Sequence, residues 1–468
     1  MLPPFDPWRT CTAMLEVARG SAATPLELAR MQSQRLATLL RAAKRSALYG
    51  GIIGNNDPST LSLTDLPVMR KQELMDQFSA WVTEPDVTLD ALRAFMAKPE
   101  NIGSAFQGRF MPWESSGSHG EPGIFVQDAA AVAVYDALEY HRRRVPRPID
   151  HALDPWGLAE RKVFIGAIDG HFASTCSIER LRRLNPIMAS TLHSLSFMVP
   201  ISVLTDQLHA IKPAFIATYP SVAVMLAEER LAGRLDVAPR EVWTGGETLT
   251  DGMRALIAQA FGCTVVNSYG ASEFMSLASE CSHGSLHLNS DWAILEPVDE
   301  AGKHMPPGEA GATTLLTNLA NHTQPIIRYD LGDRVALHEA PCACGSHLPV
   351  ISVEGRSGDL MHVGNRDTGQ ASISGLALST VLETVSGLTD FQLIQIAPCK
   401  LELRTGLPSA SASEVLQQAR GVLQSFLRSQ GAKGVEIQCI GGRPSRRTRN
   451  GKAERVVALP ATPHRVKG

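Results

Sequence analysis

The sequence predicts an α/β protein in which a large layered α/β body with a helical preface is followed by a small α+β lid domain. The 468 residues are too many for a single hydrophobic core. Between Arg109 and about Val335, short apolar β-runs alternate with helical stretches, as is typical of a layered α/β body. After Asp359, strand-like runs surround one helix, which is the pattern of a small α+β domain.

The composition is that of an ordinary globular protein, with 44% hydrophobic residues and a net charge of −3. This charge argues against electrostatic capture of nucleic acid or of an anionic membrane. Eight cysteines without a signal-peptide pattern favour a reduced, cytoplasmic protein over a disulfide scaffold. No window approaches the roughly 18 apolar residues of a transmembrane helix. We expect neither nucleic-acid nor membrane partners, and a homodimer is one open option.

Residues 1–100 form the predicted preface, which packs on the body and carries no chemistry. Thr24 is a predicted helix cap, because proline follows it and Glu27 stands three residues later. Apolar residues then recur at helical spacing until the glycine pair at 50–51 ends the helix. A second helical stretch is expected over 64–81.

Residues 101–354 form the predicted body. Expected strands are 162–165, 214–217, 241–244, 264–267 and 313–317, and expected helices are 129–144, 178–184, 222–231 and 251–261. Three of these strands end in polar or glycine-containing turns, at 219–221, 244–247 and 267–273. Ligands of open α/β sheets collect at the carboxyl ends of the strands. The three turns therefore predict one nucleotide pocket.

A serine- and glycine-rich loop precedes the apolar run at 124–126. From Ser115 to Glu121 it holds two glycines and three serines. Glycine permits close backbone approach, and successive N–H groups and hydroxyls form a concave surface that suits phosphate. The alternative is a polar surface turn.

Residues 355–468 form the predicted lid, after a hinge near 354–359. Strands are expected at 391–397, 401–404 and 435–440. Between the last two, a helix is expected from a cap at Ser411, with Glu414 at the third position, to Gly431. The resulting order is ββαβ.

Six motifs follow one another in a fixed order along the chain. They are Ser-Ser-Gly-Ser-His-Gly at 115–120, Gly-Gly-Glu at 245–247, Tyr-Gly-Ala-Ser-Glu at 269–273, Ile-Arg-Tyr-Asp-Leu-Gly-Asp at 327–333, Glu-Gly-Arg-Ser-Gly-Asp at 354–359 and Gly-Lys at 451–452. In this order the chain resembles the adenylate-forming (acyl-CoA synthetase-like) superfamily. Within it, the chain looks most like the phenylacetate-CoA ligase branch. That branch shares the helical preface, the Leu-Pro…Lys…Leu segment at 66–74 and the segment 287–291. The resemblance spans residues 26–457.

The resemblance implies an adenosine-binding set on the body. Its members are Gly245, Gly246, Glu247, Tyr269, Gly270 and Asp333. The glycines would permit flat approach of the base, and Tyr269 would stack on adenine. Asp333 would accept both ribose hydroxyls, which requires two acceptor oxygens.

The resemblance also implies a set that holds the phosphates of ATP and Mg²⁺. The loop for the β- and γ-phosphates consists of Ser115, Ser116, Gly117, Ser118, His119 and Gly120. Ser272 would bind the α-phosphate, and Glu273 would hold Mg²⁺, which prefers carboxylate oxygen. Arg328 and Arg356 would lie on the phosphate or ribose side.

Lys452 is the predicted catalytic lysine, together with Glu273 and Arg328. Its segment, 447–452, resembles the family's mobile lysine loop. Adenylation joins a carboxylate to the α-phosphate, so negative charge gathers in the transition state, and a lysine brought in by domain closure offsets it. The alternative for this arginine-rich segment is a solvated basic tail.

The resemblance implies ATP- and Mg²⁺-dependent activation of a carboxylic acid as the acyl-adenylate, followed by transfer to CoA. Three departures from the family pattern weaken parts of this expectation. Gly358 replaces the usual hinge aspartate, and 361–374 lacks the usual Arg-Gly-x-Asn and Phe-Pro residues. Both fall on the thioester-forming side of the cycle. Glu121 replaces a lysine common after the phosphate loop, which removes one cation from the triphosphate.

Two alternatives to a CoA ligase stay open. One is a non-CoA acceptor, such as an amine, a carrier-protein thiol or a hydroxyl, as in the deazaflavin-adenylating synthetases of the same branch. The other is a nucleotide-binding or scaffold protein with reduced catalysis.

The acid pocket is predicted by position in the family pattern. His171 and Phe172 stand where members of the family contact the acid, and Tyr219 and Ala271 would form other walls. The phenylalanine and the small alanine permit an aryl ring, so the expected acid is aromatic. The alternative for Phe172 is an ordinary core position.

A second cluster is independent of the resemblance. Cys281, His287, Cys342 and Cys344 offer four ligands for tetrahedral structural Zn²⁺, with His283 as an alternate fourth ligand. The sequence separation is long for a zinc finger, so the fold must bring the two groups together. The alternative is unliganded cysteines in turns.

Overall fold

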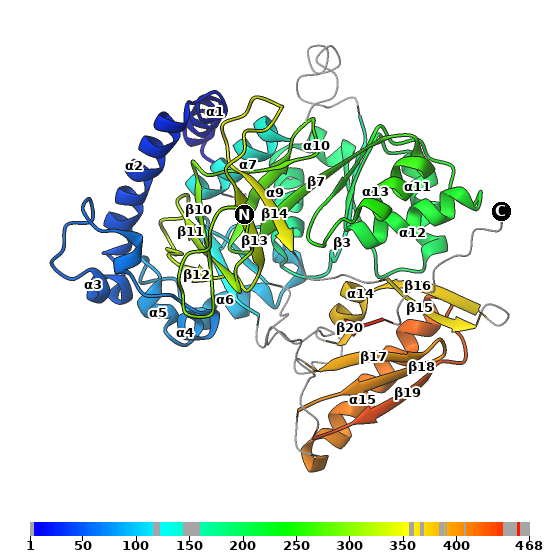
Figure 1. Cartoon of the computed structure of the whole chain (residues 1–468). Helices are drawn as coiled ribbons and strands as arrows, with labels where there is room; N and C mark the ends of the chain where they lie inside the picture. The colour runs from blue at the N-terminus through cyan, green and yellow to red at the C-terminus, as the bar shows by residue number, and fades with distance from the viewer. Residues whose placement is uncertain are drawn as a thin grey trace.

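The computed structural model describes residues 4–115, 122–143, 160–354, 360–365, 369–382, 388, 391–406, 409–442 and 456–458. Most of the predicted phosphate loop (116–120), Arg356 and Gly358 of the hinge motif, and Lys452 lie outside these ranges. Figure 1 shows the amino-terminal helices at one end of the molecule and the carboxy-terminal strands at the other.

The predicted helical preface is present. Its elements are α1 (Pro7–Ser21), α2 (Pro25–Ala43), α3 (Ala47–Ile53), α4 (Lys71–Asp76), α5 (Phe78–Trp81), α6 (Leu89–Met96) and the 3-10 turns η1 (Leu63–Asp65) and η2 (Pro99–Asn101). The predicted cap of α2 is confirmed, because the Thr24 N–H donates to Glu27 Oε2 at 2.9 Å and the Glu27 N–H donates to Thr24 Oγ1.

Two boundaries predicted for the preface are wrong. α2 ends at Ala43 rather than at residues 50–51, because Ser46 caps the separate helix α3, which contains both glycines. The helix expected over 64–81 is broken into η1, α4 and α5. Leu66 is extended, with φ −101° and ψ 144°, as is usual for a residue that precedes proline.

A nine-stranded sheet forms the centre of the body, in the order β13-β14-β9-β8-β7-β6-β5-β3-β4. Its strands are β3 (Lys162–Gly166), β4 (Leu192–Ser196), β5 (Phe215–Thr218), β6 (Glu241–Thr244), β7 (Thr264–Ala271), β8 (Phe274–Glu280), β9 (Leu286–Leu288), β13 (Arg334–His338) and β14 (Val350–Glu354). The part from β4 to β7 is parallel, and β8, β9, β14 and β13 extend it in antiparallel pairs. The strand expected at 313–317 is β11, which lies in a different sheet.

Helices border both faces of the parallel part (Figure 1). They are α7 (Ala129–Arg142), α9 (Ala173–Leu184), α10 (Pro186–Thr191), α11 (Ile201–Ile211), α12 (Pro220–Leu231) and α13 (Asp251–Phe261). Val163 and Ile165 of β3 share a buried cluster with residues of α11, α12 and α13. Phe164 between them faces the other way, because successive side chains of a strand alternate.

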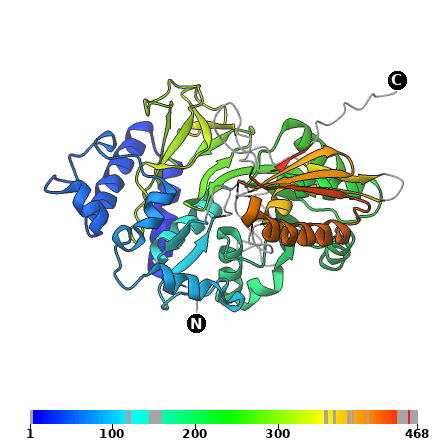
Figure 2. The same ribbon diagram turned by 90° about the horizontal axis from the view of Figure 1, so that it is seen from below.

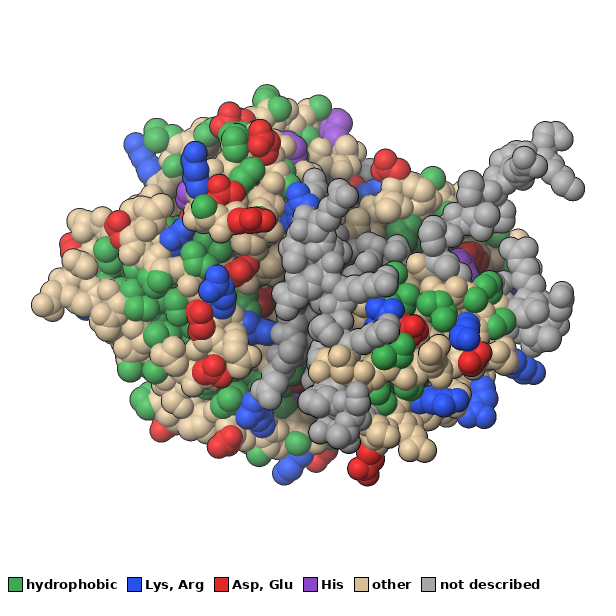
Figure 3. All heavy atoms as spheres, turned by 60° about the horizontal axis from the view of Figure 1, so that its bottom comes forward, with side chains coloured by type: hydrophobic (Ala, Val, Ile, Leu, Met, Phe, Trp, Pro, Cys, Tyr) green, Lys and Arg blue, Asp and Glu red, His purple; other side chains and the backbone are tan. Residues whose placement is uncertain are grey.

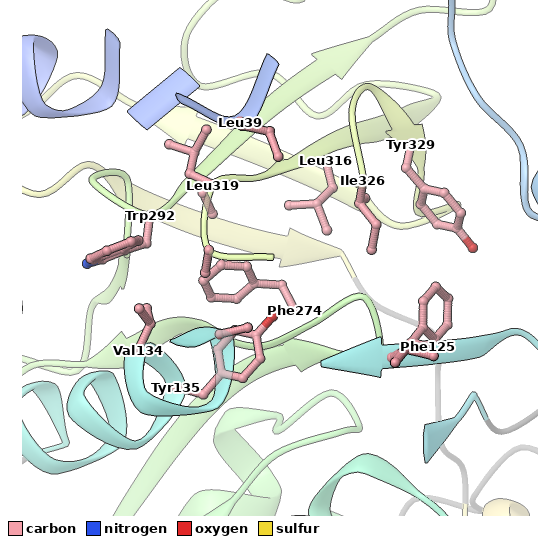
Figure 4. Packing of buried hydrophobic residues seen from close by; sticks show 14 of the residues in the cluster. Leu39, Phe125, Val134, Tyr135, Phe274, Trp292, Leu316, Leu319, Ile326 and Tyr329 are labelled. Carbon is pink, nitrogen blue, oxygen red and sulfur yellow. The ribbon is translucent and has the colours of Figure 1, made fainter. Parts of the chain in front are cut away.

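Smaller sheets complete the body. They are the pair β1 (Met111–Glu114) and β2 (Ile124–Gln127), and the three-stranded sheet of β10 (Ala293–Val298), β11 (Thr313–Asn318) and β12 (Tyr329–Asp330). Figure 4 shows the core between them and the preface. At its centre the rings of Tyr135 and Phe274 meet edge to face at 5.0 Å, and Asn318 Nδ2 donates to the buried Tyr135 hydroxyl at 2.9 Å. The loop after β7 is therefore anchored in this core through Phe274.

The parallel register aligns the strand ends that the sequence singled out. Thr218 pairs with Thr244, and Thr244 pairs with Asn267. Thr218 and Thr244 end β5 and β6, and Asn267 stands midway along β7, so the segments after β5 and β6 leave the sheet beside the second half of β7. The expected turns at 219–221 and 244–247 do line one cavity with residues 269–273, but the bounds of the third expected turn are wrong, because β7 continues to Ala271.

The carboxy-terminal region contains the predicted ββαβ unit. Its elements are β15 (Leu360–Asn365), β16 (Gly369–Ser374), α14 (Gly375–Thr380), β17 (Gln392–Ala397), β18 (Lys400–Arg404), α15 (Ser409–Ser429), β19 (Glu436–Ile440) and β20 (Val456–Val457). The sheet order is β19-β18-β17-β20, and Figure 2 shows α15 along one side of it. α15 begins at Ser409, so the predicted cap at Ser411 is wrong. The β15–β16 hairpin was not predicted.

Apolar packing joins this region to the body. One buried cluster includes Leu204 of α11, Val224 of α12, Ile373 of β16 and Leu393 of β17. Gln430 Nε2, just after α15, also donates to the backbone oxygen of Met198 at 2.8 Å. The domain boundary at 354/355 and the mobility of the lid stay predictions.

The surface charge and the apolar character of the helices can be compared with the expectations from the sequence. On the face in Figure 3, acidic and basic side chains of the described residues are interspersed. No helix within the described ranges has the length and apolar character needed to cross a bilayer.

Candidate active site

A cavity of about 1440 Å³ runs along one face of the parallel strands and reaches the edge where they end, because both the first and the last residues of these strands line it. The predicted site residues that line it are Ser115, Phe172, Tyr219, Gly245, Gly246, Glu247, Tyr269, Gly270, Ala271, Ser272, Glu273 and Asp333. Its volume exceeds the roughly 300–1,000 Å³ of most small-molecule pockets. The cavity therefore has room for a nucleotide and a second ligand.

The Gly-Gly-Glu turn after β6 is held against the start of α12. Gly246 has φ +79°, and a Cβ built on it would lie 3.0 Å from the Tyr219 ring, so both conformation and space favour glycine. Glu247 Oε2 accepts a hydrogen bond from the Ser221 N–H at 3.0 Å. The carboxylate thus ties the turn to the amino-terminal end of α12.

The Tyr-Gly-Ala-Ser-Glu motif covers the end of β7 and the two-residue connection to β8, and this connection is fixed through its backbone. Trp113 Nε1 donates to the Ser272 carbonyl at 2.7 Å, and Asn318 Nδ2 donates to the Glu273 carbonyl at 2.8 Å. Both donors come from the buried core, which leaves the two side chains to line the cavity. Glu273 is only 9% exposed, so its carboxylate acts in a site largely shielded from bulk water.

Tyr269 and Asp333 are joined directly. The Tyr269 hydroxyl donates to Asp333 Oδ2 at 2.9 Å, although 64 residues separate the two positions. Tyr269 is on β7, and Asp333 stands between β12 and β13. The hydrogen bond sets an aromatic face and a carboxylate at a fixed position relative to each other in one cavity.

Arg328 is not among the lining residues of the described cavity. It is 7% exposed, donates to the Leu66 carbonyl at 2.7 Å and pairs with Glu296 at 3.3 Å. These contacts connect the preface to β10, because a buried arginine requires both a counter-charge and acceptors. The structure does not bring Arg328 to the predicted site, and a direct role in catalysis stays a prediction.

His171 also lies away from the cavity, whereas the next residue, Phe172, lines it. The His171 side chain is 3% exposed and meets the Phe95 ring at 6.1 Å. Burial lowers the pKa of His171 to about 4, and a hydrogen bond to the Asn101 backbone only partly opposes this effect. A neutral, buried histidine is part of the core beneath the cavity.

This buried histidine predicts acid sensitivity. Its folded pKa of about 4 lies below the ordinary value of 6.5, so the unfolded chain binds the additional proton. Stability is therefore complete above pH 6.5 and falls as the pH drops toward 4, by up to about 3 kcal/mol. Urea unfolding at pH 7.5 and 5.0 measures the loss.

His171→Asn is the matched variant for this measurement, since it cannot titrate in this range. His322 and His193 also have lowered pKa values and contribute to the acid sensitivity of both proteins. The difference between wild type and variant isolates His171. Equal losses in the two proteins would contradict the assignment.

Solved structures of 2-hydroxyisobutyryl-CoA ligase match nearly the whole chain. Its complex with 2-HIB-AMP and CoA in the thioesterification state has a TM-score of 0.57 and 21% identity, covering 94% of this chain and 91% of that one. Its postadenylation complex with 2-HIB-AMP has a TM-score of 0.54 and 21% identity, covering 95% and 92%. The chain has the adenylate-forming fold. The phenylacetate-CoA ligase branch stays a prediction.

Similarity in sequence is more limited. Protein CapK of Staphylococcus aureus is 26% identical over 217 residues, which is 45% of this chain and 45% of CapK. The chain thus matches less than half the length of this curated relative. No family model matches the chain.

One wall of the cavity consists of residues that were not predicted from the sequence. Phe164, Ala217 and Trp243 stand in one row across β3, β5 and β6, and all three line the cavity. Lys71 of α4 lines it as well and adds a cation at the side of Ser115. The period-2 alternation of the strands placed the three apolar residues on one face, but which face borders a cavity depends on the helices that cover it.

The second predicted cluster assembles outside this cavity. One ligand atom from each of Cys281, His287, Cys342 and Cys344 lies within 4.8 Å of the other three. Hydrogen bonds from the Cys344 backbone and from His287 lower the pKa of Cys342, whereas burial raises the pKa of Cys344. The alternate ligand, His283, is exposed and bonds to Ser282 Oγ.

Proposed function

We propose that this chain is an ATP- and Mg²⁺-dependent ligase that activates a carboxylic acid as the acyl-adenylate and transfers the acyl group to CoA. The observation that carries the proposal is the gathering of Tyr269, Glu273 and Asp333 around one cavity in a chain with this fold. The ligase with the similar structure binds an acyl-AMP and CoA.

The adenosine end of the cavity is assigned to Tyr269 and Asp333. Tyr269 offers an aromatic face for adenine, and the Asp333 carboxylate offers acceptors for the ribose hydroxyls. Because the two side chains are hydrogen-bonded, base and sugar would be positioned as one unit. Gly246 lets the turn pack closely on the Tyr219 ring, because a Cβ at this position would lie 3.0 Å from that ring.

The phosphate end is assigned to Ser115, Lys71 and Glu273. Ser115 and Lys71 line the cavity where the serine-glycine loop begins. The shielded Glu273 carboxylate fits Mg²⁺, a hard cation that prefers oxygen ligands. When bound, Mg²⁺ neutralises charge on the phosphate oxygens.

The proposed reaction has two displacements. First, an oxygen of the carboxylate attacks the α-phosphorus of ATP, a new P–O bond forms and the bond to pyrophosphate breaks. Then the CoA thiol loses its proton to solvent, its sulfur attacks the acyl carbon, and AMP leaves with the electrons of the C–O bond. In the first step, Lys452 is proposed to offset charge on the α-phosphate oxygens, and Ser272 to donate to them.

The acid is proposed to be aromatic. The apolar row of Phe164, Ala217 and Trp243 lies one residue before the ends of β5 and β6 and two before the end of β3, which is about 3 to 7 Å at roughly 3.3 Å per residue. Phe172, which precedes α9, and Ile178 within α9 also line the cavity. An aryl ring fits between such walls because aromatic pairs favour edge and offset contacts.

A non-CoA acceptor is the second candidate. The observation that favours it is Gly358, which replaces the hinge aspartate of the family pattern on the thioester-forming side. An amine, a carrier-protein thiol or a hydroxyl would then attack the same acyl-adenylate. The adenosine and phosphate assignments are common to both candidates.

Acid-dependent release of pyrophosphate tests the proposal. The protein is incubated with ATP, Mg²⁺ and a panel of aryl and short aliphatic acids, with and without CoA. We expect release that requires an acid, is largest with aryl acids, and yields a thioester only when CoA is present.

The other possible outcomes of this assay would each change a different part of the proposal. Release without thioester would favour the non-CoA acceptor. Preference for short aliphatic acids would overturn the aromatic assignment alone. Absence of release with every acid would overturn the ligase proposal and leave a nucleotide-binding protein.

A further inference from the structure

The Cys/His cluster has ligands from two separate turns. Cys281 follows β8 and His287 is on β9, whereas Cys342 and Cys344 belong to the connection between β13 and β14. Pairing of β9 with β14, with His287 opposite Val350, brings these segments together. We propose that the four side chains bind one structural Zn²⁺ ion.

The separations within the cluster fit a shared metal. Cys281 Sγ and Cys342 Sγ are 3.8 Å apart, and Cys344 Sγ and His287 Nε2 are 3.3 Å apart. Tetrahedral Zn²⁺, with Zn–S near 2.3 Å and Zn–N near 2.0 Å, places two sulfurs about 3.8 Å apart and sulfur and nitrogen about 3.5 Å apart. These two separations match those of a tetrahedral site, and all four ligand atoms lie within 4.8 Å of one another.

His287 is oriented as a metal ligand. Its Nδ1 lies 2.7 Å from the Leu348 carbonyl, so Nδ1 carries the proton and donates to that oxygen. In the neutral ring Nε2 then has the free lone pair, and it lies 3.3 Å from Cys344 Sγ. A hydrogen bond from the outer nitrogen to a carbonyl is the usual support for a zinc-bound histidine. The ring is 5% exposed, which excludes competing water.

The position of the cluster indicates a structural rather than a catalytic metal. Three thiols and one imidazole complete a four-coordinate shell and leave no open position for substrate. None of the four residues lines the described cavity, whereas Leu286, the neighbour of His287 on β9, and Val353 of β14 do. The ion would therefore link β9 and β14, two strands of the cavity wall, at a site outside the cavity.

Metal analysis of protein purified without chelator tests the proposal. We expect about one zinc per chain in the wild type. Cys344→Ser is expected to lose the zinc. Cys11→Ser, at an exposed cysteine on α1, is the matched control and is expected to keep it. A wild-type protein without zinc, or a Cys344→Ser protein that retains it, would overturn the proposal.

Two measurements on the wild-type chain do not depend on the folding of a variant. Replacement of the metal by Co²⁺ is expected to give the intense visible bands of a tetrahedral thiolate site, and an octahedral spectrum would contradict it. A thiol count after denaturation without reductant is expected to find all eight cysteines. Two missing thiols would instead indicate a Cys281–Cys342 disulfide. Neither readout depends on the ligase activity.

Discussion

Lys452→Ala is expected to reduce acid-dependent pyrophosphate release by about 10²- to 10³-fold. The acid carboxylate and the α-phosphate are both anionic, so the transition state of their joining has more concentrated negative charge than either reactant alone. A lysine ammonium that reaches these oxygens only in the closed enzyme stabilises that state selectively. Initial rates at saturating ATP and acid measure the loss.

The second half-reaction supplies the control for this prediction. Supplied acyl-adenylate and CoA are expected to form thioester at a nearly unchanged rate in Lys452→Ala, because the charge of adenylation is absent from that step. Lys433→Ala changes an exposed lysine between α15 and β19 and is expected to retain both activities. Unchanged pyrophosphate release in Lys452→Ala would show that the basic segment is a solvated tail.

The convergence of the site could be predicted because it depends on local patterns. Runs of apolar residues identified the strands, and parallel pairing then places their carboxyl ends at one edge. The pairs Thr218–Thr244 and Thr244–Asn267 follow directly from that topology. The Tyr269–Asp333 contact agrees with motif order, but only the fold supplies its 2.9 Å hydrogen bond.

The positions of Arg328 and His171 could not be predicted, because both depend on packing between distant segments. Glu296 and the Leu66 carbonyl, far from Arg328 in sequence, hold its guanidinium away from the cavity. His171 and Phe172 are neighbours, yet the chain turns one side chain into the core and the other toward the cavity. A sequence motif identifies both residues as candidates but does not say in which direction either side chain points.

The metal ligands illustrate an intermediate case. Residue type and local clustering identified Cys281, His287, Cys342 and Cys344, since soft ligands in two compact groups are typical of zinc sites. The long interval between the groups left their proximity open. Pairing of β9 with β14 closes that interval, and this long-range pairing has no local sequence signal.

Asp291→Asn is expected to destabilise the protein by about 3–5 kcal/mol, because it removes the counter-charge of the buried Arg142. Asp291 is completely buried, and its two oxygens accept from Arg142 at 2.7 and 2.8 Å. Arg35 donates to the Asp291 backbone oxygen at 2.6 Å and stacks on Trp292 at 3.5 Å. Asparagine keeps the size of the side chain and removes the charge. Urea unfolding followed by tryptophan fluorescence measures the change.

This ion cluster joins the preface to the body, so its loss affects more than one element. Arg35 is on α2 and Arg142 ends α7, whereas Asp291 precedes β10. A Cβ on Gly20 of α1 would lie 2.3 Å from Asp291 Oδ2, so α1 also packs directly against the carboxylate. Loss of the carboxylate charge in Asp291→Asn is expected to loosen the preface before the central sheet unfolds.

Glu229→Gln is the matched control, because it removes one carboxylate from a pair whose arginine, Arg234, is 62% exposed. Exposed pairs contribute about 0–1 kcal/mol, so this variant is expected to unfold close to the wild-type urea concentration. Limited proteolysis adds a local readout, since Asp291→Asn should expose cleavage sites in the preface first. If both variants unfold at the wild-type concentration, the buried cluster does not hold the preface on the body, and apolar packing around residues such as Leu39 must do so instead.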